Sequence, residues 1–148
     1  MSVQLSQTIT LCEQMIQNCD IDYKLLTNAN LHESYFDDYN NTRVVNSFLF
    51  TYSKLQDKIG SKLFKQLLYE LQEIDSFDIP MIDILNTLER LNLITKSQWD
   101  RLREIRNLLA HEYPFSPQER VENIKVTLDS YITLKNIFQK IADAAKQL

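Results

Sequence analysis

Residues 44–71 read VVNSFLFTYSKLQDKIGSKLFKQLLYEL, and this stretch decides the fold class of the chain. Its apolar residues return every three or four positions, the spacing that lines one face of an α-helix. They are Val44, Val45, Phe48, Tyr52, Leu55, Ile59, Leu63, Leu67 and Leu71. Gly60, the only glycine of the chain, falls inside this stripe, where it costs a helix only about 0.5–1 kcal/mol. We therefore predict one long helix from about residue 40 to about residue 74, bent near the glycine.

The segments on either side show the same helical periodicity. Residues 3–27 predict a first helix, with an apolar stripe of Leu5, Ile9, Cys12, Ile16, Cys19, Tyr23 and Leu26. Residues 28–39 lose the period, which predicts a loop with a short helical turn. Residues 75–79 read as a connection, and Pro80 suits the first turn of a short helix that ends near residue 91.

Capping signals mark the last two helices. Thr95 or Ser97 can cap a helix that ends near residue 112, because Pro114 keeps the residue before it out of the α region. Residues 116–119 read Ser-Pro-Gln-Glu, with a capping serine, a proline at the first helical position and a glutamate at the third. They predict the start of a final helix, whose apolar stripe is Val121, Ile124, Leu128, Tyr131, Leu134, Ile137, Phe138 and Ile141.

The composition favours helices throughout the chain. With one glycine and three prolines the chain has few residues suited to tight hairpin turns, which need positive φ angles. A length of 148 residues fits one domain with a core of its own. We therefore predict an all-α, up-and-down bundle of four main helices plus a short one, in a single domain over residues 1–148.

Charge and cysteine content limit the partners and the compartment. Sixteen basic and twenty acidic residues give a net charge of −4, so any contact with nucleic acid must be local or rely on a few arginines. The sequence has no export signal and no run near the ~18 apolar residues of a membrane span, so we expect a cytoplasmic protein without a membrane partner. Cys12 and Cys19 lie about two helical turns apart and read as buried free thiols rather than as a disulfide or a metal site.

Residues 106–113 read RNLLAHEY and place an arginine, an imidazole and a phenol close together. On a helical wheel of about 100° per residue, the core face of this helix holds Trp99, Leu102, Ile105, Leu108 and Leu109. The adjoining arc holds Arg103, Arg106, Asn107, Ala110 and His111, with Arg106 at the border. Arginine can hold a phosphate and histidine can move a proton near neutral pH. This polar strip therefore predicts phosphodiester chemistry.

Each of these residues also has a structural interpretation. Arg106 can form an ordinary ion pair with Glu104 or with a neighbouring helix. His111 suits a helix C-terminus because of the helix dipole, and Tyr113 can pack over the end of the bundle.

Other side chains leave two interpretations open. Asp57, with Lys54 and Lys58, can line the same cleft or form a solvated charged face. Phe50 lies off the main stripe of its helix and can mark a dimer or partner surface, and His32 reads as a surface residue.

Residues 101–114 resemble the signature of HEPN-domain proteins, and in particular the HepT-like toxins of bacterial HEPN/MNT toxin–antitoxin pairs. The matching residues are Arg106, the polar Asn107 after it, His111 in an Arg-x4-His spacing, and Tyr113 two positions later. The predicted bundle, with the motif near the end of the penultimate helix, also agrees with that family. The resemblance covers most of the chain in architecture, but its specificity lies in these few residues.

The resemblance implies a type VII-like toxin, a metal-independent endoribonuclease that cuts RNA such as tRNA or mRNA. Arg106, Asn107 and His111 would be the catalytic residues, and Arg103 would contact the substrate. The site would lie across a homodimer, and the residues give an independent reason for this. Acid–base catalysis needs two proton-transfer groups, the motif holds one histidine, and a symmetric dimer supplies two.

The resemblance also implies a regulator. In that family a minimal nucleotidyltransferase antitoxin, the MNT partner, transfers AMP from ATP to the tyrosine that corresponds to Tyr113. The sequence has no glycine-rich phosphate loop and no metal-ligand spacing, so we expect no metal or cofactor bound by this chain itself.

Two other functions remain open on the sequence alone. The bundle also resembles nucleotidyltransferase-associated substrate-binding proteins, in which the chain is a partner subunit without its own catalysis, and the acidic composition favours this. A helical adaptor that carries the motif by chance is the third interpretation.

Overall fold

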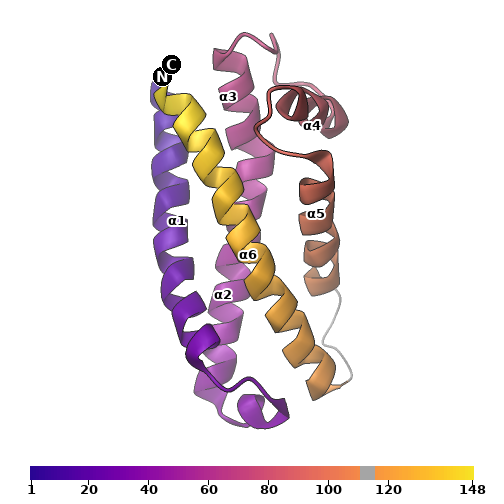
Figure 1. The fold of residues 1–148 in the computed structure, drawn as a ribbon. Helices are drawn as coiled ribbons and strands as arrows, with labels where there is room; N and C mark the ends of the chain where they lie inside the picture. The colour runs from indigo at the N-terminus through magenta and orange to yellow at the C-terminus, as the bar shows by residue number, and fades with distance from the viewer. Residues whose placement is uncertain (111–115) are drawn as a thin grey trace.

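The computed structural model describes residues 1–110 and 116–148, and every regular element within them is helical (Figure 1). In chain order the elements are α1 (Val3–Asn28), the 3-10 turn η1 (Glu33–Asp37), α2 (Tyr39–Lys58), the π turn η2 (Ile59–Leu63), α3 (Phe64–Glu70), α4 (Met81–Arg90), α5 (Lys96–Ala110) and α6 (Pro117–Lys146). The all-α prediction is therefore confirmed for the described part of the chain.

The long helices run up and down. Figure 1 shows α1 descending from the N-terminus, the continuous run α2–η2–α3 ascending, α5 descending and α6 ascending to a C-terminus beside the N-terminus. The short α4 lies across one end of the bundle, between α3 and α5. This is the predicted arrangement of four main helices and a short one.

Polar side chains cap the helices as their types suggest. Ser2 Oγ accepts a hydrogen bond from Leu5 N (3.1 Å) at the start of α1. Thr95 Oγ1 accepts from Gln98 N (3.2 Å) at the start of α5, and Ser116 Oγ accepts from the first-turn amides of α6. These bonds satisfy amide groups that have no partner inside their own helix.

The predicted long helix ends four residues earlier than expected, at Glu70 rather than near residue 74. Gln72 has a φ of 60°, and Glu73 N donates to Leu68 O (2.9 Å). This hydrogen bond after a left-handed residue is the Schellman motif, which ends a helix. Asn92, with a φ of 59°, forms the same kind of turn after α4. In this glycine-poor chain, Gln72 and Asn92 adopt the left-handed conformation that glycine more often supplies.

Gly60 does not end the helix but sits in a π turn between α2 and α3. A Cβ atom at this position would lie 2.8 Å from Cζ2 of Trp99, which is too close for a real contact. Trp99 belongs to α5, is only 3% exposed, and packs edge-on against Phe64 with ring centroids 4.8 Å apart. The absence of a side chain at Gly60 therefore lets the indole of α5 dock directly on the helix backbone.

The core contains both cysteines. Cys12 and Cys19 are buried and free, as expected, and burial raises the pKa of each thiol to about 12, which keeps it protonated at neutral pH.

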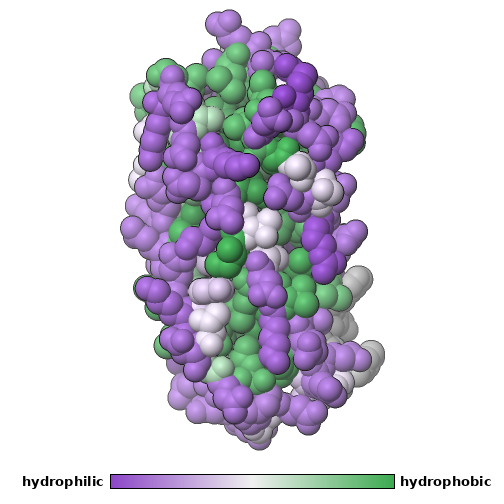
Figure 2. All heavy atoms as spheres, viewed as in Figure 1, coloured by the Kyte–Doolittle hydropathy of each residue, from purple (hydrophilic) through white to green (hydrophobic). Residues whose placement is uncertain are grey.

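On the face shown in Figure 2, hydrophilic residues cover the two sides and hydrophobic residues show along the middle, where α6 crosses in Figure 1. Within the described ranges, none of the helices combines the length and apolar character required to cross a bilayer.

Candidate functional site

A pocket of about 460 Å3 lies where α5 crosses the end of α2 and the π turn η2. Three of the residues predicted from the sequence line it, namely Arg103, Arg106 and Asn107. The other lining residues are Gln56, Asp57, Gly60, Ser61, Met81 and Trp99. The structure therefore brings the described members of the polar strip of α5 against a second polar wall, supplied by α2 and η2.

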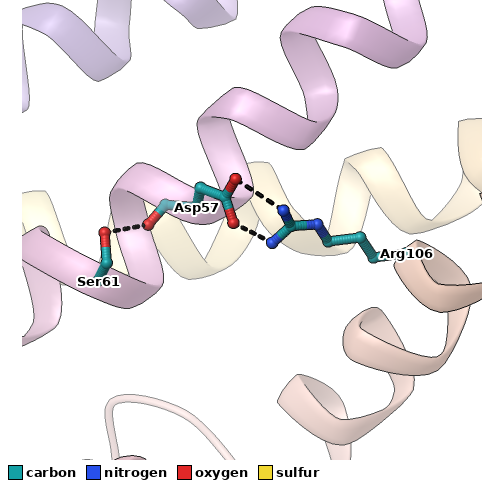
Figure 3. A network of polar contacts seen from close by, with 3 residues as sticks. All are labelled: Asp57, Ser61 and Arg106. Atoms are coloured by element: carbon teal, nitrogen blue, oxygen red, sulfur yellow. Dashed lines mark hydrogen bonds and ion pairs between the residues drawn. The ribbon is translucent and has the colours of Figure 1, made fainter. Parts of the chain in front are cut away.

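The central interaction of this pocket is a two-point ion pair between Arg106 and Asp57 (Figure 3). Nη1 of Arg106 donates to Oδ1 of Asp57, and Nη2 donates to Oδ2 at 2.7 Å. This fork-to-fork geometry fixes the plane of the guanidinium group as well as its position. Arg106 is thus anchored to α2, the neighbouring-helix alternative, whereas Glu104 pairs with Arg101 instead (3.5 Å).

The strength of this ion pair decides what Arg106 can do. The side chains of Arg106 and Asp57 are 39% and 45% exposed, so water screens their attraction and the pair contributes only about 0.2–1 kcal/mol. A guanidinium group has five N–H donors, and Asp57 takes two of them. The two-point geometry sets the orientation of Arg106, and its remaining N–H donors are left for a phosphate.

The backbone of Asp57 has a hydrogen-bond partner on the π turn that follows it. Ser61 lies four residues after Asp57, on the π turn, and its Oγ donates to the backbone oxygen of Asp57 (2.6 Å) (Figure 3). Because π turns interrupt the regular helix and are frequent at functional sites, this wall of the pocket differs from an ordinary helix face. Of the three residues Asp57, Lys54 and Lys58 that were predicted to line this cleft or form a charged face, only Asp57 lines the pocket.

Gln56 is a polar residue of this pocket that the sequence interpretation missed. It is only 2% exposed, and its Oε1 atom has no hydrogen-bond partner among the described residues. An unsatisfied buried polar atom costs about 1–3 kcal/mol, so such an atom in a pocket wall is a candidate acceptor for a ligand donor. No local pattern marks this residue, since it lies beside Leu55 on the buried side of the apolar stripe.

The electrostatic surroundings of Arg106 include a buried phenol. Tyr52 is fully buried and its hydroxyl shares a hydrogen bond with Ser130 Oγ (2.9 Å). Burial raises the pKa of Tyr52, and the hydrogen bond to Ser130 and the positive charge of Arg106 oppose that rise. The phenol is therefore neutral and adds no second negative charge beside Asp57.

The remaining described residues of the strip lie nearer the surface. Arg103 is 58% exposed and lies 3.8 Å from Asp100 in a weak pair on its own helix. Asn107 is exposed at the rim of the pocket. The prediction that Leu108 belongs to the core is wrong, because its side chain is 43% exposed while Trp99, Leu102 and Ile105 are buried. The buried arc of α5 is narrower than the wheel suggested.

The predicted catalytic residue His111 and the predicted modification site Tyr113 lie outside the described residues.

Two other predictions concern described surface residues. Phe50 is 65% exposed, with the ammonium group of Lys54 5.5 Å from its ring centre. His32 is exposed and caps η1 by accepting a hydrogen bond from Ser34 N (3.2 Å).

Within the described part of the chain, no three histidine, cysteine, aspartate or glutamate side chains are grouped so that they could hold a metal ion. Comparison of the chain with protein-family models, with curated proteins and with solved structures found no match. Fold and site together define an all-helical bundle, over the described residues, with a polar, arginine-containing pocket between α2 and α5.

Proposed function

We propose that the protein is an endoribonuclease toxin of the HEPN/MNT type that acts in the cytoplasm. The observation that carries the proposal is the oriented guanidinium of Arg106, held by Asp57 in a pocket that Arg103 and Asn107 also line. With Arg103, Arg106 and Asp57 in its lining, the pocket has a net charge of +1 (two positive charges and one negative), which favours a phosphodiester in a chain whose overall charge is −4.

The proposed reaction uses the nucleophile that RNA itself contains. A base removes the proton of a ribose 2′-hydroxyl, whose oxygen attacks the adjacent phosphorus, and the bond from phosphorus to the 5′-oxygen breaks. An acid returns a proton to that leaving oxygen, so the products are a 2′,3′-cyclic phosphate and a 5′-hydroxyl. Because no external water attacks, this reaction does not require a metal-bound hydroxide.

The side chains have separate roles in this reaction. Arg106 would bind the phosphate and stabilise the negative charge that develops on it. His111 would act as base or acid, since its ordinary pKa lies near neutral pH, and Asn107 would orient the histidine or donate to the phosphate. A second copy of the chain would supply the second proton-transfer group, so we propose a homodimer.

The chemistry of the products tests this function. Incubation of the protein with tRNA or mRNA in the presence of EDTA is expected to yield fragments with 5′-hydroxyl ends, which a polynucleotide kinase labels directly. A 2′-O-methyl oligonucleotide of the same sequence is the matched control and is expected to stay intact, because its 2′-oxygen cannot be deprotonated. Cleavage of the methylated control, or fragments with 5′-phosphates, would contradict the mechanism. Absence of any cleavage would favour the non-catalytic partner subunit.

We propose further that an MNT-type nucleotidyltransferase inhibits the protein by modifying Tyr113. The phenol oxygen attacks the α-phosphorus of ATP, pyrophosphate leaves, and the phenol proton passes to a base of the partner. The added phosphate would carry negative charge and would repel the phosphates of RNA.

Mass spectrometry after incubation with the partner and ATP is expected to show one or more added AMP units on Tyr113. A Tyr113→Phe protein should gain none. A Tyr39→Phe protein, in which the lost phenol is one that the structure shows to be 74% exposed, should be modified like the unsubstituted chain. Equal modification of the Tyr113→Phe protein would remove this part of the proposal.

A further inference from the structure

A second groove lies beside η2 and shares Ser61 with the Arg106 pocket. It has a volume of about 560 Å3 and lies between the first turns of α1 and the run from the end of α2 to α3. Its lining residues are Gln4, Gln7, Thr8, Leu11, Lys58, Ser61, Lys62, Lys65, Gln66 and Phe77. We call it the lysine groove after Lys58, Lys62 and Lys65.

The described residues that line the lysine groove include three basic side chains and no acidic one. No ion pair of Lys58, Lys62 or Lys65 occurs in residues 1–110 and 116–148. The α1 residues that line the facing wall, Gln4, Gln7, Thr8 and Leu11, are uncharged. Three ammonium groups held along one helix repel each other, and an anion in the groove would relieve that repulsion.

The spacing of the lysines suits a chain of phosphates better than a single one. At about 1.5 Å per residue, the seven residues from Lys58 to Lys65 extend over roughly 10 Å of helix axis. Successive phosphates of one strand advance by about 3.4 Å along the axis of a duplex and by more along an extended single strand. The groove therefore has the length for about two or three consecutive phosphates.

The far end of the groove offers an aromatic surface. Phe77 lines the groove and stacks on Tyr69, with ring centroids 5.0 Å apart and planes at 25°. Both rings are about half exposed, and Lys65 Nζ donates to the backbone oxygen of Phe77 (3.0 Å), which ties this segment to the groove. A basic groove beside exposed aromatic rings is the arrangement that binds single-stranded nucleic acid through phosphates and stacked bases.

Ser61 lines both the lysine groove and the Arg106 pocket, so the two sites adjoin at the π turn. We propose that the lysine groove binds the phosphate backbone of single-stranded RNA. The segment bound there would lie to one side of the phosphate at Arg106. The identity of the ligand as RNA rests on the proposed function, whereas the binding itself is measured without cleavage.

The salt dependence of binding tests the groove. Fluorescence anisotropy of the whole protein with a labelled, single-stranded 2′-O-methyl RNA avoids cleavage during the titration. The Lys58→Gln/Lys62→Gln/Lys65→Gln protein is expected to bind about 10- to 100-fold more weakly. Its plot of log affinity against log salt should lose a slope of about 2, since each phosphate contact contributes about 0.7. Phe77→Ala is expected to weaken binding about tenfold without changing the slope.

The matched control is Lys24→Gln/Lys125→Gln/Lys140→Gln, which changes the net charge equally with exposed lysines outside the groove. It should change affinity by less than about twofold, and equal weakening in both triple variants would overturn the proposal. Equally tight binding of a duplex RNA with the same lysine dependence would overturn the single-strand assignment. A groove that binds RNA in a protein that cuts none would refute only the proposed function. Cleavage and binding unaffected by the lysine substitutions would refute only the groove.

Discussion

Replacement of Arg106 by lysine is expected to slow RNA cleavage by about 100-fold, and replacement by alanine by about 1,000-fold. Lysine keeps the positive charge but has no planar fork, so it cannot bind Asp57 at two points and a phosphate at the same time. The loss should fall on kcat more than on KM, because the interaction strengthens as negative charge develops on the phosphate. Single-turnover cleavage of a labelled RNA measures the effect.

The control for this experiment is Arg101→Ala on the same helix. Arg101 is 65% exposed, pairs with Glu104 and does not line the pocket of Arg106, so its loss should leave the cleavage rate within about twofold. The variants at Arg106 should remain folded, since a half-exposed ion pair contributes at most about 1 kcal/mol, and thermal unfolding checks this. Full activity of Arg106→Lys, or an equal loss in Arg101→Ala, would contradict the assigned role.

The helices were predictable because their signals are local. The apolar stripes, the caps Thr95 and Ser116, and the position of Pro80 just before α4 each act within a few residues of the chain. The end of α3 was less predictable, because Gln72 takes the left-handed conformation without the glycine that usually signals it.

The candidate site was predictable only in part, because its second wall depends on tertiary packing. The wheel placed Arg106 correctly at the border of α5, but its partner Asp57 lies 49 residues away in the sequence. The buried acceptor Gln56 likewise becomes part of a pocket only when α5 crosses α2. The error at Leu108 has the same origin, since a wheel lists apolar residues but does not show how wide an arc the neighbouring helices cover.

Replacement of Trp99 by alanine is expected to lower the free energy of unfolding by about 3–5 kcal/mol. The indole is 3% exposed, packs against Phe64 and fills the space above Gly60, so its removal leaves a cavity at the junction of α5 with η2. Leu108→Ala is the control on the same helix and should cost less than about 1 kcal/mol, because that side chain is 43% exposed. Urea unfolding measures both, and equal losses would contradict the packing described.

The same contact predicts strong coupling between Trp99 and Gly60. Gly60→Ala alone should cost about 1–3 kcal/mol, because its new Cβ would lie 2.8 Å from the indole and α5 would have to shift. In the Trp99→Ala background the clash is absent, and the same change should become neutral or stabilising by up to about 1 kcal/mol through helix propensity. Additive losses in this double-mutant cycle would show that the Trp99 indole does not require a glycine at position 60. Non-additive losses would show that the close approach of the Trp99 indole to the backbone of η2 requires a glycine at position 60.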